Sequence, residues 1–179
     1  IKADKIFYLK NKEKIYTIGE TEIVVKNEYF IVSKDVTFLR NKMLMSSDHN
    51  TTLKDYNNYN FYTVDNFNYL LNDELFRGTN INTFTPDEDE YFFSDGIIDL
   101  KTTEMMGKDL EVLFHKDMFN NNDNQPRLRG NTGYTNDFES VVSKGVFTTC
   151  KIRSDDKCPP WMIEAKEMKH DKVKKIIWY

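Results

Sequence analysis

Alanine, the residue that favours helices most, occurs only twice in this chain of 179 residues, at Ala3 and Ala165. Its scarcity argues against a helical protein. Residues that favour strands are plentiful, because aromatic residues make up 14% of the chain and isoleucine, valine and threonine are frequent. The length fits one domain that is large enough to bury a sizeable core. The composition therefore predicts an all-β domain.

Long hydrophobic runs and basic clusters are also absent. No stretch of about 18 apolar residues exists, so the sequence predicts no transmembrane helix. The formal net charge is -4 and no cluster of Lys or Arg stands out, which argues against nucleic acid as a partner. The sequence starts at Ile1 rather than at a methionine and stops at Tyr179 within a strand pattern, so we expect it to be a piece of a longer protein.

Motifs that carry catalysis are missing. The seven glycines are scattered rather than gathered in a phosphate-binding loop, and no serine lies in a nucleophile elbow. The carboxylates fall in expected turns, such as residues 87–90, where charges are usually solvated. His170 precedes Asp171 at an expected hairpin tip, and we interpret it as a surface histidine. The sequence thus predicts no enzyme, no catalytic residues and no cofactor.

The two cysteines, Cys150 and Cys158, flank a charged loop. With no Cys-x-x-Cys pair and only three histidines, no metal site is expected. A disulfide between the two cysteines, pairing with cysteines elsewhere in a longer protein, and two unpaired thiols all remain open. Either kind of disulfide would imply an oxidising compartment such as the periplasm.

A repeat of about thirty residues runs along the chain. Its frame is a small or β-branched residue, then Asp or Lys, then an apolar residue. Ala3, Ser33, Val64, Ser94 and Ala165 occupy the first position, and the first four are spaced by 30, 31 and 30 residues. A fixed period indicates stacked supersecondary units. Chance matches in a β-rich sequence are the alternative.

Within each unit, the alternation of apolar residues changes phase after the first position. Ile1 and Ala3 share one parity and Ile6 and Tyr8 share the other, so the strand needs a bulge or corner at residues 4–5 to keep one face buried. We predict equivalent corners at residues 34–35 and 166–167. Corners at the same height indicate a sheet that folds over on itself, as in a β-jelly-roll or twisted, partly open barrel of stacked antiparallel hairpins.

The chain divides into two segments of one structural domain. Residues 1–149 hold the β-jelly-roll repeat units. Residues 150–179 form a final cysteine-containing hairpin, in which Pro159-Pro160 excludes helix. We expect its first strand over residues 161–168, a charged turn over 170–175 and a second strand from Ile176.

Apolar residues at equivalent positions of the repeat would line one continuous interior. These residues are Ile6, Tyr8, Val36, Phe38, Phe67, Tyr69, Ile97 and Met168. If the halves of the jelly-roll stay apart, this lining is a hydrophobic groove for acyl chains. If they close, the same residues form an ordinary core, and the residues alone favour this simpler arrangement.

Four motifs together carry a resemblance to a known family. They are the opening Ala-Asp-Lys-Ile of residues 3–6, Pro-Arg-Leu-Arg-Gly of residues 126–130, Gly-Val-Phe-Thr-Thr-Cys of residues 145–150, and Cys-Pro-Pro-Trp of residues 158–161 leading to His170-Asp171 and the terminal Ile-Ile-Trp-Tyr. The chain resembles the N-terminal periplasmic domain of the LptD (OstA) family of lipopolysaccharide-assembly proteins. The opening motif is shared with the LptA and LptC families, whereas the cysteine-containing ending is more specific. The resemblance is weak over residues 48–124.

The resemblance implies an OstA-like jelly-roll with a hydrophobic groove on the periplasmic side of the outer membrane. The groove would receive lipopolysaccharide from an LptA-like bridge and bind the lipid A acyl chains. A C-terminal β-barrel with an LptE-like lipoprotein would follow residue 179. The family pairs cysteines near the jelly-roll with cysteines of the barrel, which makes Cys150 and Cys158 disulfide candidates. The alternatives are a soluble LptA-like bridging protein and a ligand-free structural β-repeat domain.

Overall fold

The structure, a computed structural model, describes residues 1–115, 118, 124–152 and 159–179. It is all-β, as predicted, with two 3-10 turns, η1 (Lys10–Lys12) and η2 (Arg40–Lys42), beside its strands. The strands are β1 (Lys2–Leu9), β2 (Lys14–Val25), β3 (Tyr29–Lys34), β4 (Thr37–Leu39), β5 (Leu44–Ser47), β6 (Thr51–Asp55), β7 (Phe61–Val64), β8 (Asn66–Leu70), β9 (Leu75–Phe84), β10 (Glu90–Asp99), β11 (Met105–Leu113), β12 (Arg127–Thr135), β13 (Glu139–Thr148), β14 (Ile163–Asp171) and β15 (Ile176–Trp178).

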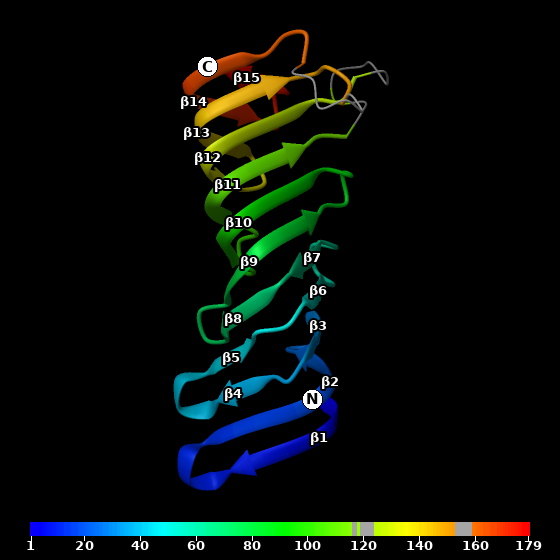
Figure 1. The fold of residues 1–179 in the computed structure, drawn as a ribbon, viewed down its shortest axis with the longest axis vertical. Helices are drawn as coiled ribbons and strands as arrows, with labels where there is room; N and C mark the ends of the chain where they lie inside the picture. The colour runs from blue at the N-terminus through cyan, green and yellow to red at the C-terminus, as the bar shows by residue number, and fades with distance from the viewer. Residues whose placement is uncertain (116–117, 119–123, 153–158) are drawn as a thin grey trace.

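Strands that are neighbours in the sheet pair antiparallel and stack as rungs from the N-terminal to the C-terminal end of the molecule (Figure 1). Two neighbouring rungs joined by a tight turn correspond to one unit of the sequence repeat. The predicted final hairpin is present as β14 and β15, and β14 pairs directly with β13. The described part of the chain is therefore one continuous sheet of 15 strands.

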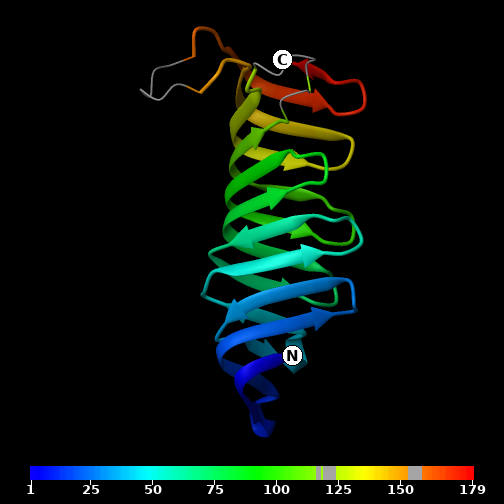
Figure 2. The same cartoon turned by 90° about the vertical axis from the view of Figure 1, so that its right-hand side faces the viewer.

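The rungs bend midway, so the sheet forms two facing layers (Figure 2). One layer, here called layer A, contains the C-terminal halves of β2 and β9 with β3, β6 and β7. Layer B contains the N-terminal halves of β2 and β9 with β4, β5 and β8. Because β2 and β9 cross between the layers, these pairings close into a ring. This region is a closed antiparallel β-barrel and is compatible with a jelly-roll.

Two of the three predicted corners are confirmed. The pairing of β1 with β2 shifts register between Ala3 and Lys5, and Asp35, with φ +50°, separates β3 from β4. Gly19 lies between these corners with φ +87°, and a Cβ there would come within 2.0 Å of the Asp4 carboxylate. Its backbone N–H donates to Asp35 Oδ1 at 2.8 Å. Glycine is needed here because only it combines this φ with such close approach.

The third corner differs from the prediction. In β14, Ala165 pairs with Gly145 and Glu167 pairs with Ser143, so the register is constant across residues 166–167. The unusual backbone lies on the neighbouring strand instead, where Lys144 has φ +49°. The bend of this rung therefore needs no extra residue in β14.

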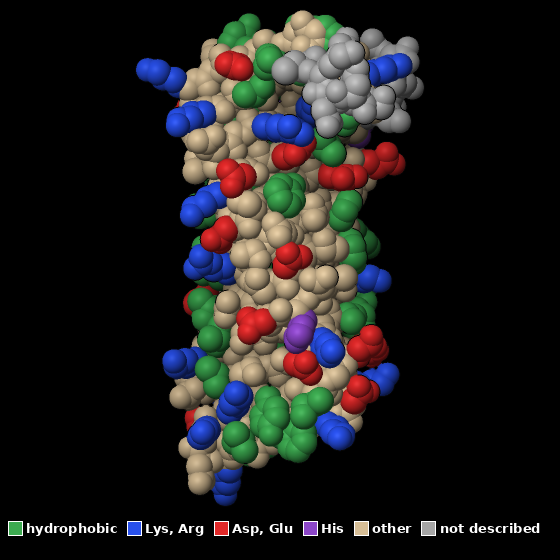
Figure 3. All heavy atoms as spheres, viewed as in Figure 1, with side chains coloured by type: hydrophobic (Ala, Val, Ile, Leu, Met, Phe, Trp, Pro, Cys, Tyr) green, Lys and Arg blue, Asp and Glu red, His purple; other side chains and the backbone are tan. Residues whose placement is uncertain are grey.

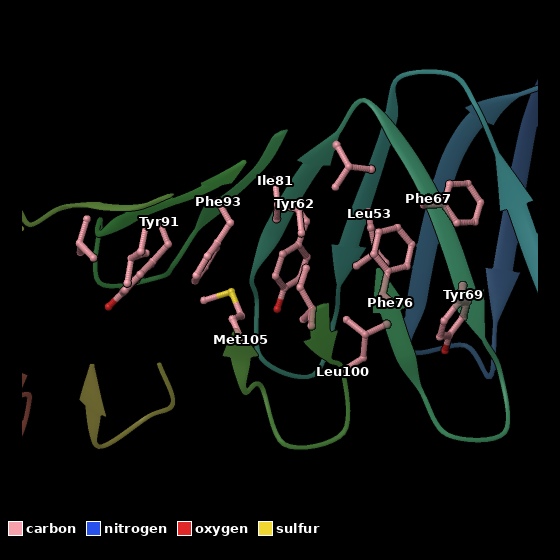
Figure 4. Packing of buried hydrophobic residues seen from close by; sticks show 14 of the residues in the cluster. Leu53, Tyr62, Phe67, Tyr69, Phe76, Ile81, Tyr91, Phe93, Leu100 and Met105 are labelled. Carbon is pink, nitrogen blue, oxygen red and sulfur yellow. The ribbon is translucent and has the colours of Figure 1, made fainter. Parts of the chain in front are cut away.

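The core lies between the two layers and is built from rows of inward residues that run across the strands. The row of layer A contains Ile23, Ile31, Leu53, Tyr62, Thr83, Tyr91, Val112, Leu128, Phe147 and Ile163. Aromatic rings fill the middle, where Phe76 stacks on Phe67 with centroids 5.1 Å apart and lies 5.8 Å from Tyr69 (Figure 4). Burial of these side chains is the main stabilising term of the fold.

Candidate functional site

Most of the predicted interior residues face the interior. Val36, Phe67, Tyr69 and Met168 are at most 2% exposed, and Phe38 is partly buried against the same core. They come from β4, β8, β14 and the junction before β4, so the repeat frame correctly identified inward positions. Their burial shows that these side chains pack in the core.

Ile6 and Tyr8 lie on the inner face of the terminal strand β1. Ile6 pairs with buried Thr17, and Tyr8 pairs with Ile15 in the inward row of layer B. Both side chains are nevertheless 50% exposed, because β2 is the only one of the described strands that pairs with β1. In Figure 3 hydrophobic side chains gather at this N-terminal end of the stack. The inner apolar surface is therefore accessible at this end of the molecule.

The prediction that Ile97 lines the interior is wrong. Ile97 pairs with Met106, which is 53% exposed, whereas the neighbouring Ile98 is fully buried. Sequence matching aligned Ser94-Asp95 with Ala3-Asp4, but β10 reaches its corner one residue earlier. Buried Phe93 occupies the first position of the frame, and Gly96 is the inward residue after the corner. A shift by one residue moves every side chain to the opposite face.

Two adjoining cavities lie among the hairpin tips, on the side of the molecule away from the corners. One has a volume of about 250 Å³ and reaches inward to Tyr91 and Met105. The other has a volume of about 400 Å³ and is lined by His115 and His170. The two cavities share four lining residues, namely Asp87, Asp89, Asp137 and Lys172. We call these two cavities together the tip site.

His170 is a buried polar group of the tip site that lacks a hydrogen-bond partner among the described residues. It belongs to the inward row of layer B, is 2% exposed, and packs edge-on against Phe114 with ring centroids 4.9 Å apart. Neither ring nitrogen has a hydrogen-bond partner among the residues that the structure describes. Burial, with a smaller contribution from the charge of Lys172, lowers its pKa to about 4, so the ring is neutral at pH 7. The interpretation of His170 as a surface histidine is wrong.

Lys172 lines both cavities. Its Nζ donates a hydrogen bond to the backbone carbonyl oxygen of Asn136 and lies 4.9 Å from the centre of the Tyr91 ring. Burial lowers its pKa to about 8, although the carboxylates of Asp89, Asp137 and Asp87 act in the opposite direction. The tip site thus holds a poorly solvated ammonium group among three carboxylates.

The remaining polar groups fix the turns that carry these carboxylates. Asp89 Oδ1 accepts a hydrogen bond from the backbone N–H of His115 at 2.8 Å and lies 3.3 Å from its Nδ1. Asp137 Oδ1 accepts one from the Thr103 hydroxyl at 2.7 Å. These contacts join turns that are far apart in sequence. No sequence motif marks the tip site, because its residues come from separate hairpin tips that only the fold brings together.

Of the two cysteines that are disulfide candidates, the structure describes Cys150 alone. Cys150 is half-buried, and its Sγ lies 3.8 Å from the carbonyl oxygen of Trp161. Cys158 lies outside the described residues, so the disulfide candidates stay a prediction.

Within the described ranges, no group of three or more His, Cys, Asp or Glu side chains is arranged to hold a metal ion. Among those residues there is also no helix with the length and apolar character to span a membrane.

No family model matches the chain, and no curated protein matches it.

Proposed function

We propose that this chain is a lipid-conducting module of lipopolysaccharide transport, with an OstA-like jelly-roll on the periplasmic side of the outer membrane. The acyl chains of lipid A would occupy the space between layers A and B. An LptA-like protein would deliver the lipid, and a following β-barrel with an LptE-like lipoprotein would receive it. The chain acts in this proposal without catalysis.

One observation carries the proposal, namely the continuous inward row of layer B. From the exposed end this row reads Tyr8, Ile15, Phe38, Met45, Tyr69, Phe76, Ile98 and Met105. The first member is half exposed, and the row becomes fully buried from Met45 onward. An apolar surface that begins in solvent and continues inside gives an acyl chain an uninterrupted path, and each methylene moved out of water contributes about 0.8 kcal/mol.

Occupation of this path requires the two layers to separate. Phe76, Ile31 and Ile81 have no exposed surface, so an acyl chain must displace packed side chains. The corners join the layers covalently along one side, whereas only turns meet along the other. The layers would therefore open at the hairpin tips.

Delivery of the lipid would use the free edge of β1. Among the described strands, β1 pairs only with β2, so its other edge can add a strand from a partner. Ile6 and Tyr8 would then continue the interior of the partner. A head-to-tail contact of this kind joins unlike surfaces and can extend into a chain of modules.

A ligand-free structural repeat is the second candidate, and the dense core favours it. In that case the exposed residues of β1 would only contact a neighbouring module. The two candidates differ in whether lipid binding depends on the inner face of β1.

Binding of purified lipopolysaccharide to the chain tests the proposal. Ile6→Glu and Tyr8→Glu place a charge on the inner face, while Phe7→Glu places it on the outer face of the same strand. All three residues are already exposed, so the fold should be retained, as circular dichroism would verify. We expect the two inner variants to weaken binding at least tenfold and Phe7→Glu to leave it within twofold. Equal binding by all variants, or no binding by the unmodified chain, would contradict the proposal.

A further inference from the structure

The inward row of layer B changes character towards the C-terminal end. After Met105 it continues with Thr135, Ser140 and His170. Thr135 and Ser140 are fully buried, and their hydroxyl oxygens lie 2.7 Å apart, so these two groups satisfy each other. His170 has no such partner among the described residues. The polar end of the row lies beside the tip site, where the interior meets the turns.

The unpartnered ring of His170 indicates a missing polar ligand. A neutral imidazole offers one N–H donor and one acceptor, and leaving both unused in a buried position is costly. The cavity of about 400 Å³ that His170 lines has room for a small polar molecule. Lys172 and the carboxylates of Asp87 and Asp137 line the same cavity and can supply further hydrogen bonds.

The charges of the tip site select the class of ligand. Three carboxylates, from Asp87, Asp89 and Asp137, line it together with two ammonium groups, from Lys172 and Lys175, so these side chains carry a net negative charge and a phosphate group would meet repulsion. Hydroxyl groups fit better, because each can donate to a carboxylate and accept from an ammonium group or an imidazole N–H. Asn58, Asn60 and Thr83 add polar groups along the inner cavity, and Met105 adds apolar surface.

We propose that the tip site binds a sugar, with His170, Lys172 and the carboxylates of Asp87 and Asp137 as its hydrogen-bonding groups. This inference rests on the proposed function in one respect: it takes the sugar to be the polar end of the lipid whose acyl chains lie along the apolar row. The change from Met105 to Thr135 in that row would mark the boundary between the two parts of the ligand.

The ring nitrogens of His170 report on the site directly in nitrogen-15 NMR spectra of the whole chain. The probes are glucose, glucosamine and inorganic phosphate, each titrated at pH 7. We expect both sugars to shift the His170 signals saturably and phosphate to leave them unchanged. Asp87→Asn combined with Asp137→Asn should raise the apparent Kd for the sugars at least tenfold. The matched control is Asp73→Asn, an exposed turn residue outside both cavities, which should leave the Kd within twofold.

Several outcomes would overturn the inference. These are no shift with either sugar, a shift with phosphate alone, or equal Kd values for the double variant and the control. The lipopolysaccharide binding assay with the β1 variants separates this inference from the proposed function. If the sugars bind but the inner-face variants of β1 bind lipopolysaccharide as tightly as the unmodified chain does, the conduit proposal fails and a sugar site remains. If lipopolysaccharide binding depends on that face and the sugars do not bind, only the sugar site fails.

Discussion

The interior of the N-terminal barrel and the interior of the C-terminal rungs follow the same strand geometry but hold different chemistry. In the barrel, two pairs of buried hydroxyl groups lie near the corners, where Thr17 pairs with Thr21 and Ser33 with Thr51, each at 2.7 Å. The rest of that interior is mainly apolar. In β12 to β14 the buried polar groups lie instead towards the hairpin tips. Position within a rung therefore decides whether polar groups support the fold or border a cavity.

The corners of the two regions also differ. On the four adjacent strands β9 to β12, the inward position on the layer B side of the corner is glycine, at Gly78, Gly96, Gly107 and Gly133. A Cβ on Gly107 would come within 2.4 Å of the backbone oxygen of Asp95. In the barrel, Val36 and Phe67 hold the corresponding position. The C-terminal rungs are thus tightest at the corner and leave space at the tips.

The largest expected effect is in the apolar region. Phe76→Ala removes a fully buried ring that contacts Phe67 and Tyr69, and should lower the free energy of unfolding by about 3–5 kcal/mol, because it creates a cavity. Urea unfolding followed by circular dichroism measures the change. Phe138→Ala is the control, since Phe138 is 68% exposed and its loss should change stability by at most about 0.5 kcal/mol. A similar loss for both variants would show that the core is loosely packed.

The polar C-terminal region should make the stability of the chain depend on pH, which the apolar region should not. The pKa of His170 is lowered to about 4 in the folded chain, from its usual value of 6.5. The unfolded chain therefore binds the proton first, so stability is retained above pH 6.5 and falls as the pH drops from 6.5 to 4. The loss from this one group is roughly 3 kcal/mol, at about 1.36 kcal/mol per pH unit. Urea midpoints between about pH 4 and 7.5 measure it.

His170→Leu is the matched variant for this measurement. It keeps an apolar contact with Phe114 and removes the titrating group. We expect its stability to be flatter between pH 6.5 and 4 than that of the unmodified chain, and at least as high at pH 7, since a buried unpartnered polar group is lost. Parallel pH profiles for the two proteins would mean that His170 is solvated.

A smaller effect is expected from the buried hydroxyl pair. Thr135→Val should lower the free energy of unfolding by about 1–3 kcal/mol, because it leaves the Ser140 hydroxyl without this partner. Adding Ser140→Ala should recover part of the loss, as a double-mutant cycle by urea unfolding would measure. Additive losses would mean that the two hydroxyl groups are not coupled.

Local sequence patterns predicted the features that depend on neighbouring residues. Alternation and composition identified an all-β chain, and the phase change at Ala3 and Ile6 located a corner that the register of β1 confirms. The same matching failed at Ile97. Ser94-Asp95 resembles Ala3-Asp4 in sequence, but it lies one residue further along its strand relative to the bend. A repeat frame that is defined only by small, polar and apolar residues cannot locate the bend of a rung to within a single residue.

The tip site could not be read from the sequence for a different reason. Asp87, Asp137 and Lys172 each lie in a charged turn, which normally indicates a solvated surface. The sequence around His170 likewise indicates a solvated surface, because this residue borders a polar hairpin tip. Its burial depends on Phe114, which is 56 positions earlier in the chain and reaches it only in the folded sheet. Long-range contacts of this kind leave no local pattern.

Site-specific photo-cross-linking along β1, in cells that make lipopolysaccharide, tests the central claim most directly. A cross-linking residue is placed in turn at Ile6, Phe7, Tyr8 and Leu9, with Phe67 as a position deeper along the path and Lys12 as an outward control. The account predicts lipopolysaccharide adducts at Ile6, Tyr8 and Phe67 and none at Phe7, Leu9 and Lys12, because only the first three face the interior. Adducts that ignore this alternation, or no adducts on a folded chain, would contradict the lipid conduit.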